Sequence, residues 1–242
     1  MPTLLQQKKA EAQALADELR PKLDKLPQRP VAVSLCDCST VMLKLWARAG
    51  FDNYSVDLSN KVRRDRFLKD GSRRTFGDVR TWAPPPEARG RVVFMAAFPP
   101  CTHVTVAGAA DFKKKGTGLL KDSLEMFSAC ITHGEWSGAP FMVENPTGVL
   151  STHVAQPDHR FHPWYYGDMW TKGTCIWSGN GFIMPEPWLD PRIPPEGLRS
   201  KTQDLPDSSW RRAEREKTPE GFAIAVFLSN VHYALDLHLR RN

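Results

Sequence analysis

The stretch Val92-Val93-Phe94-Met95-Ala96-Ala97 decides the fold of this chain. Six consecutive apolar residues indicate a strand that is buried on both faces, as in a parallel sheet. Shorter strand-like runs and segments of helical periodicity alternate around it, at residues 31–35, 41–49, 54–57, 119–133 and 140–144. This alternation predicts an α/β fold, with a Rossmann-like parallel sheet and helices on both of its faces.

The composition is that of a soluble globular protein. A chain of 242 residues suits one sizeable domain, and 41% hydrophobic and 25% charged residues are ordinary values. The sequence contains no run of about 18 apolar residues and no apolar segment behind the N-terminal lysines, so we expect no membrane span, no secretory signal and a cytoplasmic location. Five cysteines are an odd count and lack the second close pair of a structural zinc site, so no metal is expected.

Four regions are predicted along the chain. Residues 1–28 form a helical arm, in which leucines recur at helical spacing and Pro21 interrupts or ends the helix. Residues 29–177 hold the alternating strands and helices and form the central domain. Residues 178–217 are rich in proline and contain no long helical pattern, whereas residues 218–242 form an apolar helix that returns to the central domain.

Three acids follow predicted strands: Asp37, Asp57 and Asp78. Ligands of such sheets bind at the carboxyl ends of the strands, and Asp57 lies 20 residues after Asp37, the spacing at which an acid can bind ribose hydroxyls. Each acid alone is more often a cap or turn residue, but the ordered set predicts a nucleoside site in which Asp78 meets an adenine amine. The turn at residues 35–40 has no glycine, so it suits a methionine tail better than a pyrophosphate.

The segment Phe98-Pro99-Pro100-Cys101-Thr102-His103 directly follows the strand at 92–97. Two prolines stiffen this turn and fix where the Cys101 thiol emerges, which packing alone would not require. Glu144 ends the next predicted strand, in Glu144-Asn145-Pro146, so its carboxyl group is expected near Cys101. The loop at 104–118, rich in Gly and Lys, can close over a polyanionic substrate.

A thiol beside a carboxylic acid suits addition across the C5–C6 bond of a pyrimidine. Attack of the Cys101 thiolate at C6 turns C5 into a carbon nucleophile, and proton donation from Glu144 to N3 stabilises the developing charge. C5 then takes a methyl group from a sulfonium donor, and elimination releases the enzyme. If the substrate is duplex DNA, the target base must leave the stack, so base flipping is implied.

Phe98-Pro99-Pro100-Cys101 and Glu144-Asn145-Pro146 resemble, in their order and separation, the catalytic motifs of DNA cytosine C5 methyltransferases, in the style of small phage-type DNA methylases. The resemblance covers about residues 31–228. It implies S-adenosylmethionine as cofactor and double-stranded DNA with a flipped cytosine as partner. It also fits a monomer without membrane or metal, in the cytoplasm of a bacterial host if a phage encodes it.

The resemblance also implies residue roles. Residues 170–177 resemble the family's Gln-x-Arg-x-Arg strand, with Lys172 and Thr174 where two arginines hold O2 of the cytosine, and residues 178–217 would be the target-recognition region. The implied catalytic residues are Cys101, Glu144, Lys172 and Thr174. The implied cofactor-binding residues are Leu35, Cys36, Asp37, Asp57, Leu58, Asp78, Val79, Phe98, Pro100 and Thr218.

The formal net charge of +6 and the sequence pI of about 9.1 suit a polyanionic partner. Basic residues gather in three clusters, at residues 61–74, 113–115 and 199–217. A single cluster is more often a solvated face, but three clusters beside the predicted site favour phosphate contacts. The residues expected to contact DNA are Thr102, Lys113, Lys114, Lys115, Arg199, Lys201, Arg211 and Arg212.

Other functions fit parts of this pattern. An amino-methyltransferase needs an aromatic residue after Pro-Pro, where this chain has Cys101, so that reaction is excluded. A free pyrimidine nucleotide or RNA as substrate, or a group other than methyl, would use the same thiol and acid and stays open. Thr102 replaces the family's usual Gln, and Lys172 and Thr174 replace its arginines, so a DNA-binding homologue without chemistry also stays open. The short region at 178–217 predicts short or relaxed sequence specificity.

Overall fold

The computed structural model describes residues 1–60, 62–105, 117–200 and 217–241. Helices (α), short 3-10 or π turns (η) and strands (β) follow one another in this order: α1 (Leu4–Leu23), β1 (Val31–Leu35), η1 (Val41–Leu43), α2 (Lys44–Ala49), β2 (Asp52–Asp57), β3 (Arg66–Phe67), β4 (Arg73–Phe76), η2 (Pro86–Ala88), β5 (Val92–Ala97), α5 (Thr117–Ser137), β6 (Phe141–Pro146), η3 (Leu150–Val154), β7 (His159–Phe161), η4 (Pro163–Tyr166), β8 (Trp170–Thr171), β9 (Thr174–Gly179), β10 (Arg199–Ser200) and α7 (Glu220–Arg241).

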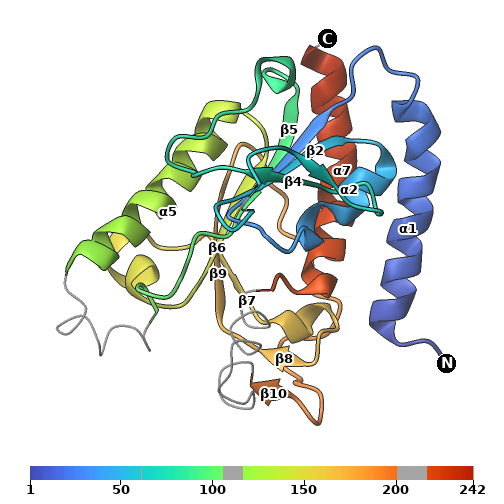
Figure 1. The fold of residues 1–242 in the computed structure, drawn as a ribbon. Coiled ribbons are helices and arrows are strands. Elements are labelled where there is room, and N and C mark those ends of the chain that lie inside the picture. Colours follow the sequence, from blue (N-terminus) through green and yellow to red (C-terminus); the bar gives the residue numbers. More distant parts are fainter. Residues whose placement is uncertain (61, 106–116, 201–216, 242) are drawn as a thin grey trace.

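One eight-stranded sheet runs through the molecule in the order β3-β4-β2-β1-β5-β6-β9-β7 (Figure 1). The strands from β4 to β6 are parallel, whereas β3 is antiparallel to β4 and β9 is antiparallel to both of its neighbours. The strand order reverses between β1 and β5, which is the switch point where such sheets bind ligands. The predicted α/β class, with a mostly parallel sheet and helices on both faces, is confirmed.

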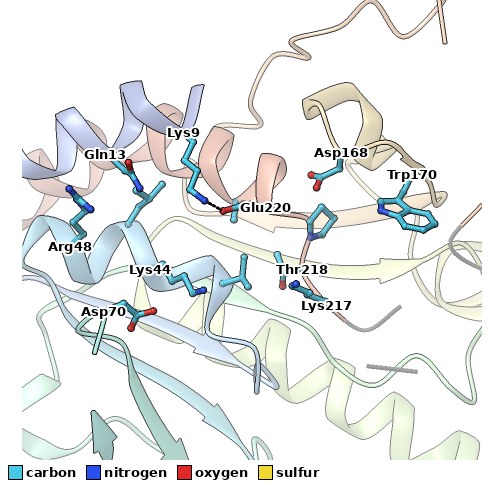
Figure 2. A pocket seen from close by; sticks show the side chains of 14 residues that line it. Lys9, Gln13, Lys44, Arg48, Asp70, Asp168, Trp170, Lys217, Thr218 and Glu220 are labelled. Atoms are coloured by element: carbon cyan, nitrogen blue, oxygen red, sulfur yellow. Dashed lines mark hydrogen bonds and ion pairs between the residues drawn. The ribbon is translucent and has the colours of Figure 1, made fainter. Parts of the chain in front are cut away.

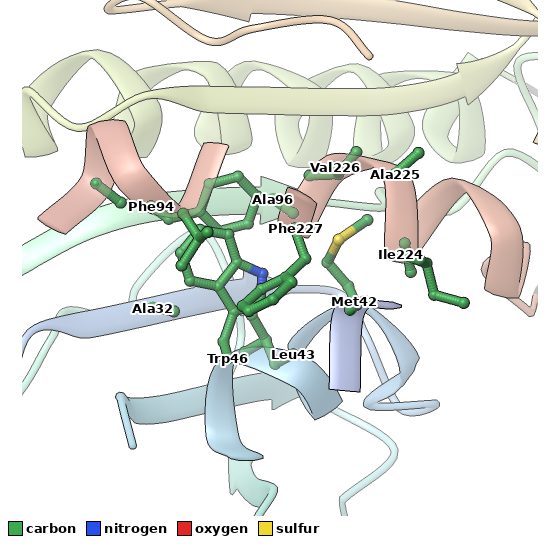
Figure 3. Packing of buried hydrophobic residues seen from close by; sticks show 14 of the residues in the cluster. Ala32, Met42, Leu43, Trp46, Phe94, Ala96, Ile224, Ala225, Val226 and Phe227 are labelled. Atoms are coloured by element: carbon green, nitrogen blue, oxygen red, sulfur yellow. The ribbon is translucent and has the colours of Figure 1, made fainter. Parts of the chain in front are cut away.

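Helices α1, α2 and α7 cover one face of the sheet (Figure 1). The centre of this layer is Trp46, whose ring stacks on Phe94 of β5 at 4.3 Å and meets Phe227 of α7 edge-on at 5.4 Å (Figure 3). Helix α7 is long and apolar enough to cross a membrane, with a mean hydropathy of 1.3, but 56% of that stretch is buried inside the fold. It therefore behaves as a core helix, with Phe222 and Val226 fully enclosed.

Helix α1 packs against α2 and α7 in this layer. A stripe of four small or apolar residues faces α2 and α7, and all are buried: Ala12, Ala16, Leu19 and Leu23. The helix continues through Pro21, because a proline in the last turn removes a single N–H donor and the backbone N–H of Asp24 still donates to the Arg20 carbonyl at 2.9 Å. Helix α5 covers the opposite face, where Phe127 packs edge-on against Trp177 of β9.

Candidate active site at the carboxyl edge of the sheet

The sheet register places the predicted site residues along one edge. A row of paired residues crosses the four central strands near their ends: Val56, Leu35, Ala97 and Val143. The next residue on each strand is a predicted site residue: Asp57, Cys36, Phe98 and Glu144. Because neighbouring strands lie about 4.8 Å apart, the segments that follow β2, β1, β5 and β6 start side by side at the switch point.

The loop that carries Cys101 is fixed to the strand that carries Glu144. The buried side-chain amide of Asn145 donates to the carbonyl oxygen of Pro99 at 2.8 Å. Further along, the backbone N–H of Val149 donates to the Val104 carbonyl at 2.7 Å. Gly148 is required at this crossing, because a Cβ atom there would collide with the Val104 carbonyl oxygen. The thiol of Cys101 is reduced and half-buried, and its position is set by this paired backbone.

Glu144 and Lys172 form an ion pair inside the site. The Nζ atom of Lys172 lies 3.1 Å from Oε1 of Glu144, and their side chains are only 15% and 13% exposed. Strand β9 produces this contact, because it runs antiparallel to β6 and places Thr174 opposite Pro146. Thr174 supports the turn, since its hydroxyl donates to the Lys172 carbonyl at 3.0 Å. Three of the four predicted catalytic residues therefore share one contact network beside the Cys101 loop.

The turn after β1 adopts conformations that its lack of glycine did not predict. Cys36 and Thr40 have φ angles of 53° and 61°, in the left-handed region that usually favours glycine. The carboxylate of Asp37 stabilises this turn by accepting hydrogen bonds from the backbone N–H groups of Ser39 and Thr40 and from the hydroxyl of Ser34. Asp37 is 3% exposed, and its carboxylate serves the turn itself. Cofactor binding at Asp37 stays a prediction.

This role of Asp37 predicts a pH effect. Burial raises the pKa of Asp37 above its ordinary value, although hydrogen bonds from Ser39 and Ser34 oppose the rise. The folded protein then holds this proton more tightly than the unfolded chain does, so the residue's contribution to stability declines as pH rises from about 3.9 through the folded pKa. Asp37→Asn can keep the N–H contacts and is expected to match or exceed wild-type stability at pH 7, whereas Asp37→Ala costs about 1–3 kcal/mol.

Urea unfolding of the wild type and both variants between pH 4 and pH 8 measures this effect. The difference between Asp37→Asn and wild type should grow in favour of the asparagine as the pH rises. A large loss of cofactor binding in an otherwise stable Asp37→Asn protein would contradict a purely structural carboxylate.

Asp57 and Asp78 differ in how open their carboxylates are. Oδ1 of Asp57 accepts the backbone N–H of Ser59 at 2.7 Å, which leaves Oδ2 for ribose hydroxyls. Both oxygens of Asp78 already accept hydrogen bonds from the guanidinium of Arg80. These side-chain hydrogen bonds, and to a lesser extent the positive charge of Arg80, lower the pKa of the Asp78 carboxyl group. An adenine amine would therefore compete with Arg80 for Asp78, a contact that the sequence pattern did not reveal.

Several other predicted cofactor residues turn their side chains into the core. Leu35 and Val79 are buried, so only their backbone groups can reach a ligand. Cys36 packs toward α5, where it lies beside Cys130. Burial, and then the hydrogen bond with Cys36, raise the pKa of the Cys130 thiol well above its usual range. Of the others, Phe98 is half-buried, whereas Leu58 and Pro100 are exposed at the edge and can face a ligand.

Thr218 lies apart from this row, in a cavity of about 560 Å³ between α1, α2, β8 and the start of α7 (Figure 2). Of the predicted site residues, the cavity lining includes Thr218 alone. Lys9 and Glu220 form an ion pair of 2.7 Å within it. Asp168 accepts the backbone N–H of Gly221 at 2.8 Å and so ties the start of α7 to the segment before β8. No local sequence pattern predicts this link, because the two residues lie 53 positions apart.

The residues expected to contact DNA are only partly described by the structure. Thr102 is exposed beside Cys101, and the guanidinium of Arg199 lies 4.9 Å from the centre of the Trp170 ring. The remaining residues predicted for DNA contact lie outside the described part of the chain: Lys113, Lys114, Lys115, Lys201, Arg211 and Arg212. Among the residues that are described, no three His, Cys, Asp or Glu side chains gather in a way that can hold a metal ion.

No protein-family model and no curated protein matches this sequence. One similar solved structure is magnesium protoporphyrin IX methyltransferase (ChlM) from Synechocystis PCC 6803 with bound SAH, at 16% identity and a TM-score of 0.28. The match covers 64% of this chain and 65% of that one, so it spans slightly less than two thirds of the methyltransferase. The fold assignment therefore rests on the strand order and register of this chain.

Proposed function

We propose that this protein is an S-adenosylmethionine-dependent DNA methyltransferase that modifies C5 of cytosine through a covalent adduct on Cys101. The observation that carries the proposal is the pairing of two segments. The hydrogen bond from Asn145 to Pro99 holds the Pro-Pro-Cys loop against the strand that ends in Glu144. A thiol and a carboxyl group supplied by adjacent strand ends are the two groups that C5 chemistry on a pyrimidine requires.

Each side chain has a defined task in this reaction. The Cys101 thiolate forms a bond to C6, and the electron pair of the C5–C6 bond moves to C5 while N3 takes a proton from Glu144, which acts here in its protonated form. Lys172, 3.1 Å from Glu144, orients that carboxyl group and offers a cation for the O2 atom of the base. The bound cofactor would supply an electrophilic methyl group. Loss of the C5 proton to a solvent base then restores the C5–C6 double bond and expels sulfur from C6 as the Cys101 thiolate, while N3 returns its proton to Glu144.

The residues at the switch point fit such a cofactor in part. Asp57 retains a carboxylate oxygen for ribose, and the left-handed backbone at Cys36 brings the turn after β1 close to the edge without a glycine. Asp78 fits less well, because Arg80 occupies its carboxylate. These contacts are compatible with a nucleoside that carries a short amino-acid tail, and the affinity is expected to depend chiefly on Asp57.

Methyl transfer from labelled S-adenosylmethionine to duplex DNA, RNA and dCMP tests the proposal, together with trapping on duplex DNA that contains 5-fluorocytosine. We expect 5-methylcytosine in DNA and a protein–DNA adduct that survives denaturing electrophoresis. Product in RNA or dCMP alone would reassign the substrate. Tight DNA binding with neither product nor adduct would make the protein a binding homologue.

The size of the recognition region predicts the specificity. Residues 178–200 are described, and after the end of β9 at Gly179 they contain one further strand, the two-residue β10, which pairs with β8. A region this small offers little surface for reading base edges in the major groove, so we expect short or relaxed sequence specificity. Bisulfite sequencing of DNA from expressing cells measures it, and strict methylation of one six-base-pair site would contradict it.

A further inference from the structure

Residues 58–74, called here the basic segment, carry almost all of the chain's excess charge. They contain seven Lys or Arg residues and two Asp residues, an excess of five positive charges in a protein whose formal net charge is +6. The rest of the chain is therefore close to neutral. Such a concentration marks one part of the surface as the place where a polyanion is attracted.

The fold puts the first part of the basic segment, up to Asp65, on the same edge as the reactive loop. It begins directly after Asp57, at the carboxyl end of β2, and β3 then folds back along β4 with Arg66 opposite Arg74. Strand β3 lies four places from β5 in the sheet order. At about 4.8 Å between strands, the segment lies roughly 19 Å from the strand that delivers Cys101.

One arginine and both acids of the basic segment already have partners within the fold. The guanidinium of Arg73 lies between the rings of Tyr54 and Phe67, at 4.0 and 4.9 Å, and pairs with Asp65 at 3.3 Å. This pairing uses one of the two acids. The other, Asp70, accepts the backbone N–H of Ser72 within its own turn.

The remaining cations of the basic segment are available to a partner. Arg64, Arg66 and Lys69 are exposed, and none of them forms an ion pair with another residue that the structure describes. The guanidinium of Arg63, also exposed, lies 5.8 Å from the centre of the Phe76 ring. A set of exposed cations beside aromatic rings is typical of a surface that binds nucleic acid.

Edge protection explains only part of this charge. Charged residues on an edge strand block pairing with other chains, and Arg66 and Lys69 can serve that purpose. Arg63 and Arg64, however, precede β3 and lie in the loop at the carboxyl edge. Phe67, with 68% of its surface exposed, also argues against a face that evolved for solubility alone.

We propose that the basic segment binds the phosphate backbone of the DNA duplex at a distance from the base that Cys101 attacks. This inference rests on the proposed function. Duplex DNA rises about 3.4 Å per base pair, so a separation of roughly 19 Å places the contact about five or six base pairs from the target. The basic segment is thus a second DNA-binding surface, separate from the region at 178–217.

The test combines a charge variant with two duplex lengths. Arg63→Gln, Arg64→Gln and Arg66→Gln are introduced together, and the matched control is Lys22→Gln, Lys25→Gln and Arg240→Gln. The control cations lie at the opposite end of the sheet, where Arg241 of α7 contacts the first residue of β5. Binding is measured to a hairpin duplex of about nine base pairs and to a duplex of about thirty, both with a central cytosine, over a range of salt concentrations.

On the long duplex, the charge variant should bind about tenfold or more weakly, and the slope of log Kd against log salt should fall by about 2.7, or 0.9 for each lost phosphate contact. On the short hairpin, which cannot reach the basic segment, charge variant, control and wild type should bind alike. The inference would be overturned if the charge variant bound the long duplex with the affinity and the salt slope of the wild type. An equal loss of affinity on the long duplex and on the short hairpin would also overturn it.

Trapping on the short hairpin separates this inference from the proposed function. If wild type forms the 5-fluorocytosine adduct but the charge variant binds the long duplex normally, the basic segment has no role in DNA binding and the enzyme assignment stands. If the charge variant aggregates on size exclusion, Arg63→Gln with Arg64→Gln, both outside β3, takes its place. A double variant that binds the long duplex with wild-type affinity and salt dependence would then overturn the inference.

Discussion

Cys101→Ser is expected to abolish the covalent adduct with 5-fluorocytosine DNA and to lower methyl transfer by about a thousandfold or more. A serine hydroxyl keeps the shape of the side chain but is not ionised near neutral pH, so it cannot add to C6 of the base. Binding of duplex DNA should change little, because backbone contacts at Pro99 and Val104 hold the loop and a serine keeps the size of the side chain. Denaturing electrophoresis and a labelled methyl donor measure both quantities.

Cys38→Ser provides the matched control for the nucleophile. Cys38 is exposed in the turn after β1 and lies outside the reactive loop, so its replacement should leave adduct formation unchanged. If Cys101→Ser retains the adduct or normal methylation, the nucleophile has been misassigned, and mass spectrometry of the trapped peptide would locate the true one.

Glu144→Gln is expected to slow methyl transfer by about a hundred- to ten-thousandfold. Glutamine has nearly the same shape as glutamate, and its carbonyl oxygen can still accept from Lys172, so the fold should be preserved. It cannot give a proton to N3, so the charge that develops when Cys101 attacks is no longer neutralised. Single-turnover methylation and the rate of 5-fluorocytosine adduct formation should decline together, whereas the Kd for DNA should not.

Lys172 supplies the comparison for this variant. Lys172→Arg keeps a cation beside Glu144 and is expected to retain substantial activity. Lys172→Met leaves the largely buried carboxylate of Glu144 without its partner, so activity should fall. The free energy of unfolding should fall as well, by about 3–5 kcal/mol. Full activity of Glu144→Gln with an unchanged adduct rate would remove Glu144 from the chemistry.

The sequence predicted the parts of the site that depend on local patterns. The apolar run at 92–97 identified β5, and the residues that follow a buried parallel strand must emerge at the carboxyl edge. For this reason the strand pattern alone was enough to place Cys101 and Glu144 near each other. The same local signal does not distinguish a carboxylate that faces a ligand from one that caps its own turn, as the carboxylate of Asp37 does.

Contacts that depend on strand order could not be predicted in this way. The insertion of β9 between β6 and β7 leaves no local pattern in the sequence, yet it alone brings Lys172 to Glu144 across 28 residues. The link from Asp168 to Gly221 depends in the same way on how α7 returns to the sheet. Such contacts follow from the packing of whole elements, whereas caps, turns and strand ends follow from residues close in the chain.

The backbone crossing at Gly148 has a consequence for engineering. Because the main chain of residues 104–105 lies against that of residues 148–149, with no room for a Cβ atom at Gly148, the segments that carry the proposed nucleophile and the proposed acid are joined to each other. Transplanting the Pro-Pro-Cys motif alone into another α/β scaffold would give a thiol with an undefined orientation. The smallest transferable module is the pair of segments 98–105 and 144–149, moved together with two adjacent parallel strands to support them.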